Sequence, residues 1–451
     1  MNLRIYIPDY LVEVSKIVLE TIEDRMIGIN FEVLPHEKEH YQVEDLNKES
    51  KFQFPALFIQ EEKEKWLTKR KTQEWGLKYF SYRDIDQLPV LFNGEPLKDV
   101  DKISIDFIGS IFFLLHRYHE QVEELPKDNF GRIYSKDSFL VRNKLHSRPW
   151  ADIYIELFRD ILEEKFSVHI PLKGEFSIMP THDVDRPFEF LYYTFPHLIK
   201  RFSGDVLKKK SLTEAKKRLN LYKSVKSGNL TVDPLNTFDW IMEQSEKAGC
   251  VSTFHFIAES TNVQFDQDYD LQDKEIQGLL ESIYDRGHEF GLHPSYGATE
   301  IGGQIKKEFL KLKELTQQYT EQRKLWRSRN HYLRWNENTI SELELAGIDI
   351  DQTLGFPALP GFRCGTSYSF KAFNFQSNSV SSVVIEPLIV MEVSLFDSSY
   401  LNLGDNLSEA WNLIDGLKRE CIRYGGNFTI LWHNNHLIEE KFKSFYMECL
   451  K

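Results

Sequence analysis

The carboxyl-terminal three-fifths of the chain repeats one pattern, in which a short apolar run is followed by polar residues and then by an amphipathic stretch. The apolar runs lie at residues 176–180, 251–257, 289–292, 324–326, 347–350, 383–387 and 428–432. Helix-like stretches lie between most of them, at residues 239–248, 273–286, 306–318 and 408–424. Strand, polar loop and helix in this order predict an α/β barrel or a doubly wound sheet. In such folds the chemistry gathers at the carboxyl ends of the strands.

The first run ends in the segment Thr181–Asp185, which carries two carboxylates one residue apart. One carboxylate can bind a divalent metal while the other takes a proton from water as general base. An Asx-rich turn that caps a following helix is the structural alternative. Recurrence favours the functional interpretation, because catalytic residue types also follow later runs. These later clusters are His293–Tyr296, Arg327–Tyr332, Asp351–Gly355 and His433–Asn435.

These segments resemble the metal-dependent polysaccharide deacetylases, the NodB-homology family, over about residues 175–440. Thr181–Asp185 is similar to the first motif of the family, Gly291–Tyr296 to the second, Arg329–Tyr332 to the third and Leu431–His433 to the last. The resemblance implies a distorted seven-stranded (β/α) barrel from about residue 171 to 451. Residues 1–170 are predicted to form a separate, smaller amino-terminal α/β domain, because short apolar runs alternate there with helical stretches.

Site roles follow from the same resemblance, residue by residue. It implies Asp183 as general base, Asp185 and His293 as metal ligands, Arg329 as the residue that holds the base, and His433 as general acid. A divalent metal, with zinc expected and cobalt or nickel as alternatives, lowers the pKa of its water and polarises an amide carbonyl. The implied activity is removal of an N-acetyl group from a carbohydrate or glycan precursor.

The sequence departs from the family pattern at one metal ligand. A second His normally follows the first by four residues, and Gly297 stands at that position. Catalytic zinc usually has three protein ligands, so another residue is needed. His331 is the preferred replacement, and His182 and His255 are weaker ones, since each can instead be an ordinary buried residue. A site with no metal, or with a weakly held one, stays open.

Substrate contacts are expected from a loop and from aromatic residues. Arg363 lies in a segment rich in Gly and Pro, residues 355–367, and its guanidinium suits anionic or polyhydroxylated ligands. The alternative is an Arg that holds its own loop through backbone carbonyls. Tyr296 and Tyr332 are expected to offer aromatic surface to a sugar, although aromatic residues are common in cores.

The amino-terminal region predicts strands at residues 3–7, 29–33 and 56–59, and helices at 105–124 and 150–166. It resembles an accessory domain that precedes some bacterial deacetylase-like proteins, and no chemistry follows from that resemblance. An insertion, residues 188–235, carries the basic runs Lys208–Lys210 and Lys216–Arg218. A basic lid over an anionic substrate is one interpretation, and a solvated helical excursion is the favoured one.

Composition limits the function classes. The 451 residues have a net charge of −13, which gives no support to nucleic-acid binding. The four cysteines are scattered, as in reduced cytosolic proteins. The longest apolar stretch, residues 107–115, is too short for a membrane span, and the first ten residues contain no secretory apolar region, so we predict a cytoplasmic location.

Two rival functions stay open at this point. One is hydrolysis of another small amide or ester, since a barrel supports many reactions. The other is a non-catalytic glycan-binding or scaffolding protein, which Gly297 favours. The joint presence of Asp183, Asp185, Arg329 and His433 argues against it, because a binding protein needs neither a base nor an acid.

Overall fold

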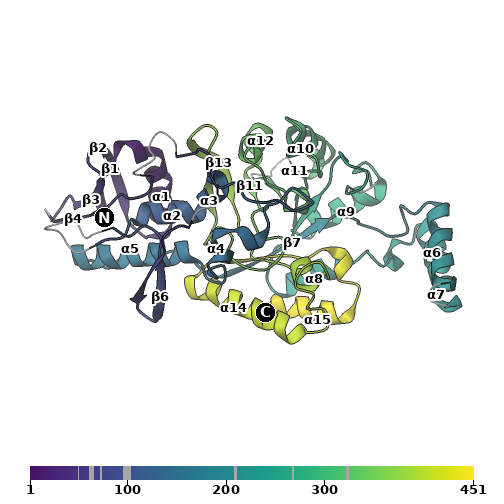
Figure 1. Ribbon diagram of the computed structural model, residues 1–451. Coiled ribbons are helices and arrows are strands. Elements are labelled where there is room, and N and C mark those ends of the chain that lie inside the picture. Colours follow the sequence, from purple (N-terminus) through teal and green to yellow (C-terminus); the bar gives the residue numbers. More distant parts are fainter. Residues whose placement is uncertain are drawn as a thin grey trace.

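The computed structural model shows an elongated α/β protein in which a large sheet with its covering helices lies between a smaller sheet and a helical hairpin (Figure 1). The described residues are 1–48, 50–59, 66–71, 74–94, 103–207, 211–266, 269–320 and 325–451. The predicted basic run Lys208–Lys210 lies outside them. Among the described helices, none combines the length and the apolar character needed to cross a bilayer.

Nine strands form the large sheet, in the order β12-β13-β11-β10-β9-β8-β7-β15-β14. Their bounds are β7 Ser177–Val184, β8 Thr253–Phe256, β9 Glu289–Leu292, β10 Arg327–Ser328, β11 Ile350–Asp351, β12 Phe370–Asn374, β13 Ser379–Ile385, β14 Val390–Met391 and β15 Asn427–Leu431. All neighbours are parallel except β12 and β13. Six of the seven predicted apolar runs share residues with a strand. The run at residues 324–326 ends just before β10, and its first residue lies outside the described ones.

The prediction of a seven-stranded closed barrel is thus confirmed only as a large, mainly parallel sheet. Strands β12 and β14 extend it to nine, and no pairing among the described residues joins these two edges. The segment after β13 does bridge the sheet in part. Glu386 N donates to Asp351 O at 2.9 Å, and Ile389 N donates to Thr429 O at 3.1 Å. This segment therefore runs from the end of β11 to β15.

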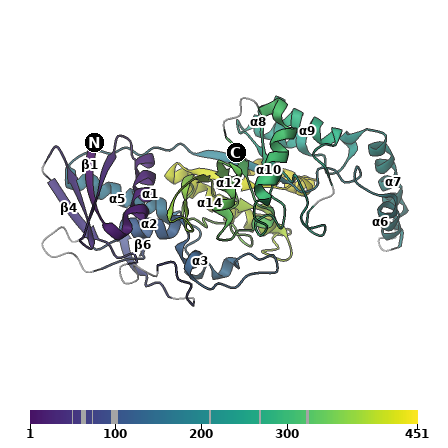
Figure 2. The ribbon, with the colours of Figure 1, turned by 90° about the horizontal axis from the view of Figure 1, so that it is seen from above.

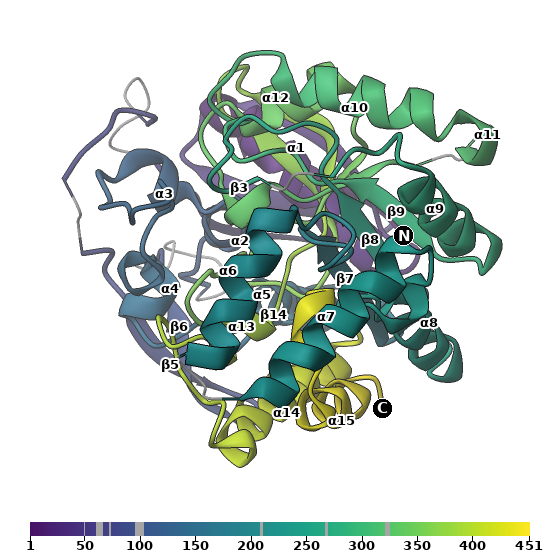
Figure 3. The same ribbon diagram turned by 90° about the vertical axis from the view of Figure 1, so that its right-hand side faces the viewer.

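Helices surround the large sheet when the molecule is viewed from the side of the hairpin (Figure 3). They are α8 Phe238–Lys247, α9 Lys274–Asp285, α10 Gln304–Leu315, α12 Thr339–Ala346, α14 Leu407–Tyr424 and α15 Glu440–Cys449. The four predicted helices correspond to α8, α9, α10 and α14. Local signals set the ends of α14: the Asn406 side chain caps the amide of Glu409, and Gly425 ends the helix at φ 68°.

The smaller sheet has the order β2-β1-β3-β4, and only β1 and β2 are parallel. Its strands are β1 Asn2–Pro8, β2 Asn30–His36, β3 His40–Asp45 and β4 Ser50–Pro55. The predicted strand at residues 56–59 is wrong, since β4 ends just before it. The amides of Leu57 and Phe58 donate to the buried carboxylate of Asp106 at 2.8 and 2.9 Å instead of to another strand. Strand β3 was not predicted.

Three helices pack beside this sheet: α1 Val12–Arg25, α2 Phe107–Leu115 and α5 Trp150–Phe166 (Figure 2). The predicted helix at 150–166 is confirmed. The one predicted at 105–124 is broken, because Arg117 adopts φ 51° between α2 and α3, Tyr118–Val122. A short hairpin, β5 Lys78–Tyr82 and β6 Ile85–Val90, completes this region.

The amino-terminal residues hold the Gly- and Pro-rich loop of residues 355–367 against the large sheet. Buried Asp152 accepts hydrogen bonds from Thr366 Oγ1 at 2.6 Å and from Ser367 N at 3.1 Å. Ala151 N donates to Gly365 O at 2.7 Å. The two parts of the chain therefore share buried polar contacts, and the loop conformation depends on both.

Candidate metal centre

Five predicted site residues meet at the carboxyl ends of β7, β9, β10 and β15. Asp183 belongs to β7 and Asp185 follows it, while His293, His331 and His433 follow the other three strands. All five line one cavity of about 330 Å³. They converge because β7 lies between β8 and β15, with β9 and β10 next in order, so that the strand ends share one edge.

Three of these residues can hold a metal ion. The ligand atoms of Asp185, His293 and His331 all lie within 4.8 Å of one another. Asp185 Oδ1 is 3.3 Å from His293 Nε2 and 3.5 Å from His331 Nε2. Ligands about 2.0–2.1 Å from one tetrahedral ion lie roughly 3.3 Å apart, so both spacings suit a zinc-like ion. Asp185 Oδ1 is also buried without a hydrogen-bond partner, as expected of an atom that binds a cation.

The outer nitrogens of both imidazoles are already engaged. His293 Nδ1 donates to the carbonyl of Arg329, and His331 Nδ1 contacts Asp266 Oδ1 at 2.9 Å. When the rings are neutral, each Nε2 therefore has its lone pair toward the cavity, which is the arrangement typical of metal-binding histidines. Asp266 is fixed in turn by the amides of Thr261 and Tyr296, at 2.8 and 2.7 Å. Sequence reasoning missed Asp266, because it follows no apolar run.

Asp183 is held from one side only. Arg329 Nη1 donates to its Oδ1 at 3.1 Å, while Oδ2 faces His293 Nε2 at 3.8 Å. Arg329 is fully buried and also donates through Nε to Gln352 O at 2.9 Å. Burial favours the neutral acid, but the charges of His293 and Arg329 outweigh it and hold the pKa of Asp183 well below its usual range. The carboxylate is thus ionised at neutral pH.

His433 has the opposite electrostatic setting. Its Nδ1 lies 2.6 Å from Glu392 Oε1, and its Nε2 faces the cavity 3.8 Å from Asp185 Oδ2. Burial favours the neutral ring, but the Glu392 carboxylate outweighs it and raises the pKa of His433 to about 10. Without a bound cation His433 is therefore protonated at neutral pH. Glu392 was not predicted, although it follows the short strand β14.

The two weaker ligand alternatives lie elsewhere in the sheet. His182 faces away from the cavity, with Nδ1 2.7 Å from Trp432 O and its ring stacked on Phe254. His255 lies beside Asp183, with Nδ1 3.3 Å from Oδ1, and is not one of the three clustered ligands. Gly297 donates its amide to Thr261 Oγ1 at 2.8 Å, and a Cβ there would be 3.0 Å from the same oxygen. The third member of the group of possible ligands is instead His331, which follows β10.

One wall of the cavity comes from the amino-terminal sequence. The ring of Phe130 stacks on Tyr332 with centroids 4.7 Å apart. Arg132 donates to Tyr332 O at 3.1 Å and to Tyr400 Oη at 2.9 Å. Tyr332 directly follows His331 and has φ 60°, which is uncommon for a residue other than Gly. The turn at residues 128–132 thus holds the loop that carries His331, a role that sequence reasoning missed.

The predicted substrate residues are divided. Tyr332 lines the cavity. Tyr296 is not part of the cavity lining; its ring packs edge-on against the ring of Tyr332, with the ring centroids 5.6 Å apart. Arg363 lies outside: it donates to Glu120 at 2.9 Å and to Gly355 O at 2.9 Å, and lines a second cavity of about 480 Å³ between the two parts of the chain. Arg363 thus holds its own loop through a backbone carbonyl, as the alternative interpretation of this residue predicts.

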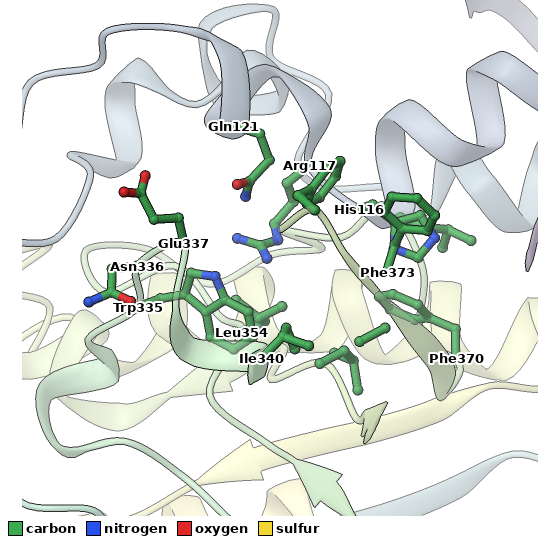
Figure 4. Close-up of a pocket in the computed structure, with 14 residues that line it drawn as sticks. His116, Arg117, Gln121, Trp335, Asn336, Glu337, Ile340, Leu354, Phe370 and Phe373 are labelled. Atoms are coloured by element: carbon green, nitrogen blue, oxygen red, sulfur yellow. The ribbon is translucent and has the colours of Figure 1, made fainter. Parts of the chain in front are cut away.

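A hollow next to this second cavity also lies away from the metal ligands (Figure 4). In it the Arg117 guanidinium lies over the Trp335 ring, 4.9 Å from the centroid. One face of the Trp335 ring is therefore in contact with another residue of the protein.

The insertion does not cover the metal site. Its two helices are α6 Phe195–Leu207 and α7 Leu212–Lys226. Residues 185–194 connect β7 to α6, and residues 227–237 connect α7 to α8. Among the described residues, none from 188–235 lines the cavity. The lid interpretation is therefore not supported by this structure, and the helical excursion describes it better.

Comparison with known proteins gives one family match and similarity to solved structures. Residues 3–167 match a family of unknown function (DUF7033). None of the curated proteins matches the chain in sequence. Among solved structures, a "putative polysaccharide deacetylase" from Mycobacterium smegmatis is 13% identical, with a TM-score of 0.39, over 63% of this chain and 85% of its own. Puue allantoinase is 13% identical, with a TM-score of 0.37, over 61% of this chain and 82% of its own.

Proposed function

We propose that the protein is a metal-dependent hydrolase that removes an N-acetyl group from a carbohydrate or glycan precursor. One observation carries the proposal: the carboxylate of Asp183 and the imidazole of His433 line the same cavity as a three-residue group that could hold a metal ion. The motif resemblance over residues 175–440 supports the deacetylase assignment and, with it, a distorted (β/α) barrel beyond residue 170. Zinc is the expected ion, and cobalt and nickel are alternatives.

Asp185, His293 and His331 would hold the cation through Oδ1 and the two Nε2 atoms. Such an ion polarises a carbonyl and acidifies water at its open position. Asp183 takes the proton from the attacking water at Oδ2, because its Oδ1 is engaged by Arg329. His433 Nε2 gives a proton to the leaving nitrogen as the C–N bond breaks, while Glu392 holds Nδ1. The products are acetate and a free amine.

The cavity lining suits a sugar better than an apolar acyl compound. Phe130 and Tyr332 present stacked aromatic rings, and Asp397, Ser399 and Asn435 add polar groups that can bind hydroxyls. Asp397 Oδ1 already accepts from Ser399 N at 2.8 Å, and its Oδ2 can accept from such a hydroxyl. A small amide or ester that is not a sugar would use the same base and acid.

The test combines metal content with acetate release. Protein purified without a histidine tag is loaded with zinc, cobalt or nickel, and its stoichiometry is measured before and after dialysis. Asp185→Ala and His331→Ala are expected to lose the metal, whereas Asp183→Asn keeps it and loses acetate release from N-acetylated oligosaccharides. His182→Ala is the matched control, because His182 lies outside the cavity.

Two results would refute parts of the proposal. If His331→Ala bound metal as tightly as the parent protein, His331 would not be a ligand. If the loaded protein bound N-acetylated sugars and released no acetate from them, the non-catalytic alternative would replace the hydrolase.

A further inference from the structure

Helices α6 and α7 form a hairpin that extends away from the rest of the molecule (Figures 1 and 2). Its base is well packed: the carboxylate of Asp233 accepts from the amides of Glu189 and Phe190, each at 2.8 Å. Phe190 also packs with Tyr193 and Val225 in a small apolar cluster. The hairpin is therefore attached as a defined structure, and what its outer surface contacts needs a separate explanation.

The hairpin exposes large apolar side chains to water. Leu207 is 75% exposed, Phe195 and Leu212 are each 63% exposed, and Ile199 is 49% exposed. The first three are among the four most exposed large apolar side chains in the described part of the chain. Phe195 and Ile199 are four residues apart and lie on one face of α6. Clustered exposed apolar groups mark a surface that is covered by something else.

The same helices are strongly basic, although the whole chain has a net charge of −13. The only acidic residues in the two helices are Asp205 and Glu214. Their basic residues are Lys200, Arg201, Lys216, Lys217, Arg218, Lys223 and Lys226. Their positive charge complements an anionic partner.

We propose that the α6–α7 hairpin docks the protein on an anionic membrane surface. Helices that lie in a membrane interface combine a basic polar face with aromatic and aliphatic residues that enter the acyl boundary. Lysines and arginines then bind the lipid headgroups, and Phe195, Ile199 and Leu207 enter between them. A polyanion such as nucleic acid would attract the same lysines but would leave the exposed apolar side chains uncovered.

Docking of this kind has a consequence for the substrate. The hairpin leaves the sheet after the carboxyl end of β7, the end that also carries Asp183 and Asp185 (Figure 3). The cavity end of the sheet would therefore be turned toward the membrane. Resting on the proposed function, this assigns the substrate to a class, namely acetylated glycans attached to a lipid.

The test measures sedimentation of the full chain with phospholipid vesicles. We expect binding to vesicles that contain phosphatidylglycerol and none to pure phosphatidylcholine. Lys200→Gln, Lys216→Gln and Lys217→Gln together should weaken binding on the order of a hundredfold, since each charge near an anionic surface contributes about 1 kcal/mol. Phe195→Ser with Ile199→Ser should weaken it by about tenfold or more.

Matched controls carry the same types of substitution, Lys to Gln and apolar residue to Ser, at exposed positions outside the hairpin. One is Lys274→Gln with Lys306→Gln and Lys313→Gln, and the other is Leu413→Ser with Ile422→Ser, two exposed apolar residues of α14. Both controls should bind vesicles like the parent protein. Every variant should keep the parent's metal stoichiometry and melting temperature, which shows that it is folded.

Three results would overturn the docking proposal. These are no sedimentation of the parent protein with anionic vesicles, unchanged binding by both hairpin variants, or unchanged binding by the apolar variant together with full release by heparin. The last would identify a general polyanion site. Failure of the proposed function is a separate outcome, because it is read from acetate release with soluble substrates, which the hairpin variants should leave unchanged.

Discussion

Replacing Glu392 by Gln isolates the charge that sets the protonation of His433. Glu392 Oε1 accepts from both Nδ1 and the backbone N of His433, at 2.6 and 3.0 Å. Its other oxygen is buried without a hydrogen-bond partner. A Gln with its carbonyl oxygen at the Oε1 position therefore keeps both hydrogen bonds and the shape of the site. Only the negative charge is lost.

The expected shift follows from that charge. Two opposite charges about 4 Å apart attract by about 4 kcal/mol at an effective dielectric constant of about 20. One pKa unit corresponds to about 1.4 kcal/mol, so the variant should lower the pKa of His433 by about 2 to 3 units. From a value of about 10, the pKa of His433 would fall close to neutrality. Asp183 and Asp185 still raise it, which keeps it from falling further.

The assay is an NMR titration of the histidine ring nitrogens. The protein is first treated with a chelator, so that no bound metal ion shifts the pKa of His433. The parent protein should keep both nitrogens of His433 protonated through about pH 8, and the variant should titrate below that pH. Glu409→Gln, an exposed carboxylate on α14, is the matched control and should leave the titration unchanged. A shift of less than one unit in Glu392→Gln would refute the assignment of Glu392 as the dominant charge.

Three further predictions concern other parts of the structure. Arg132→Gln frees the carbonyl of Tyr332 and should weaken metal binding by about tenfold, measured by calorimetry, with Arg148→Gln as control. Burial raises the pKa of Glu308 to about 7, so its contribution to stability is present below about pH 4.5 and is lost as the pH rises to about 7. Urea unfolding of Glu308→Gln should lack this loss. A chain that begins at residue 171 should be insoluble, because Arg363 loses Glu120, and breaking such a buried pair costs about 3–5 kcal/mol. A soluble, metal-binding fragment would contradict this.

The large sheet was predictable because its strands are buried on both faces. All four residues of β8 are buried, as are the last four of β15, and fully buried parallel strands give mainly apolar runs such as residues 428–432. Very short elements were not predictable. Strand β14 has two residues, and its identity depends on the pairing of Val390 with Ile430, forty positions along the chain. Closure of the sheet depends on such contacts, which no local pattern contains.

The candidate site was predictable to the extent that its residues follow apolar runs. Asp183, Asp185, His293, His331 and His433 all do, and all five line the cavity. Their partners were not predictable for the opposite reason. Asp266 lies in a loop that no strand precedes directly. Only the folded structure shows that its carboxylate is the partner of His331 Nδ1. Glu392 looks like the first residue of an ordinary helix, Glu392–Phe396.

The turn at residues 128–132 shows why the site cannot be assigned to the barrel-like part alone. Asp128 holds Arg132 at 2.8 Å, and Arg132 holds the carbonyl of Tyr332, whose positive φ directs the chain just after His331. Phe130 covers the ring of the same tyrosine. A motif comparison confined to residues 175–440 contains His331 and its partner Asp266, but not Phe130 and Arg132, which contact Tyr332 next to it. The family match at residues 3–167 ends beyond this turn, so the amino-terminal sequence contributes directly to the cavity. Metal affinity should therefore respond to substitutions in a region whose own family has no described function.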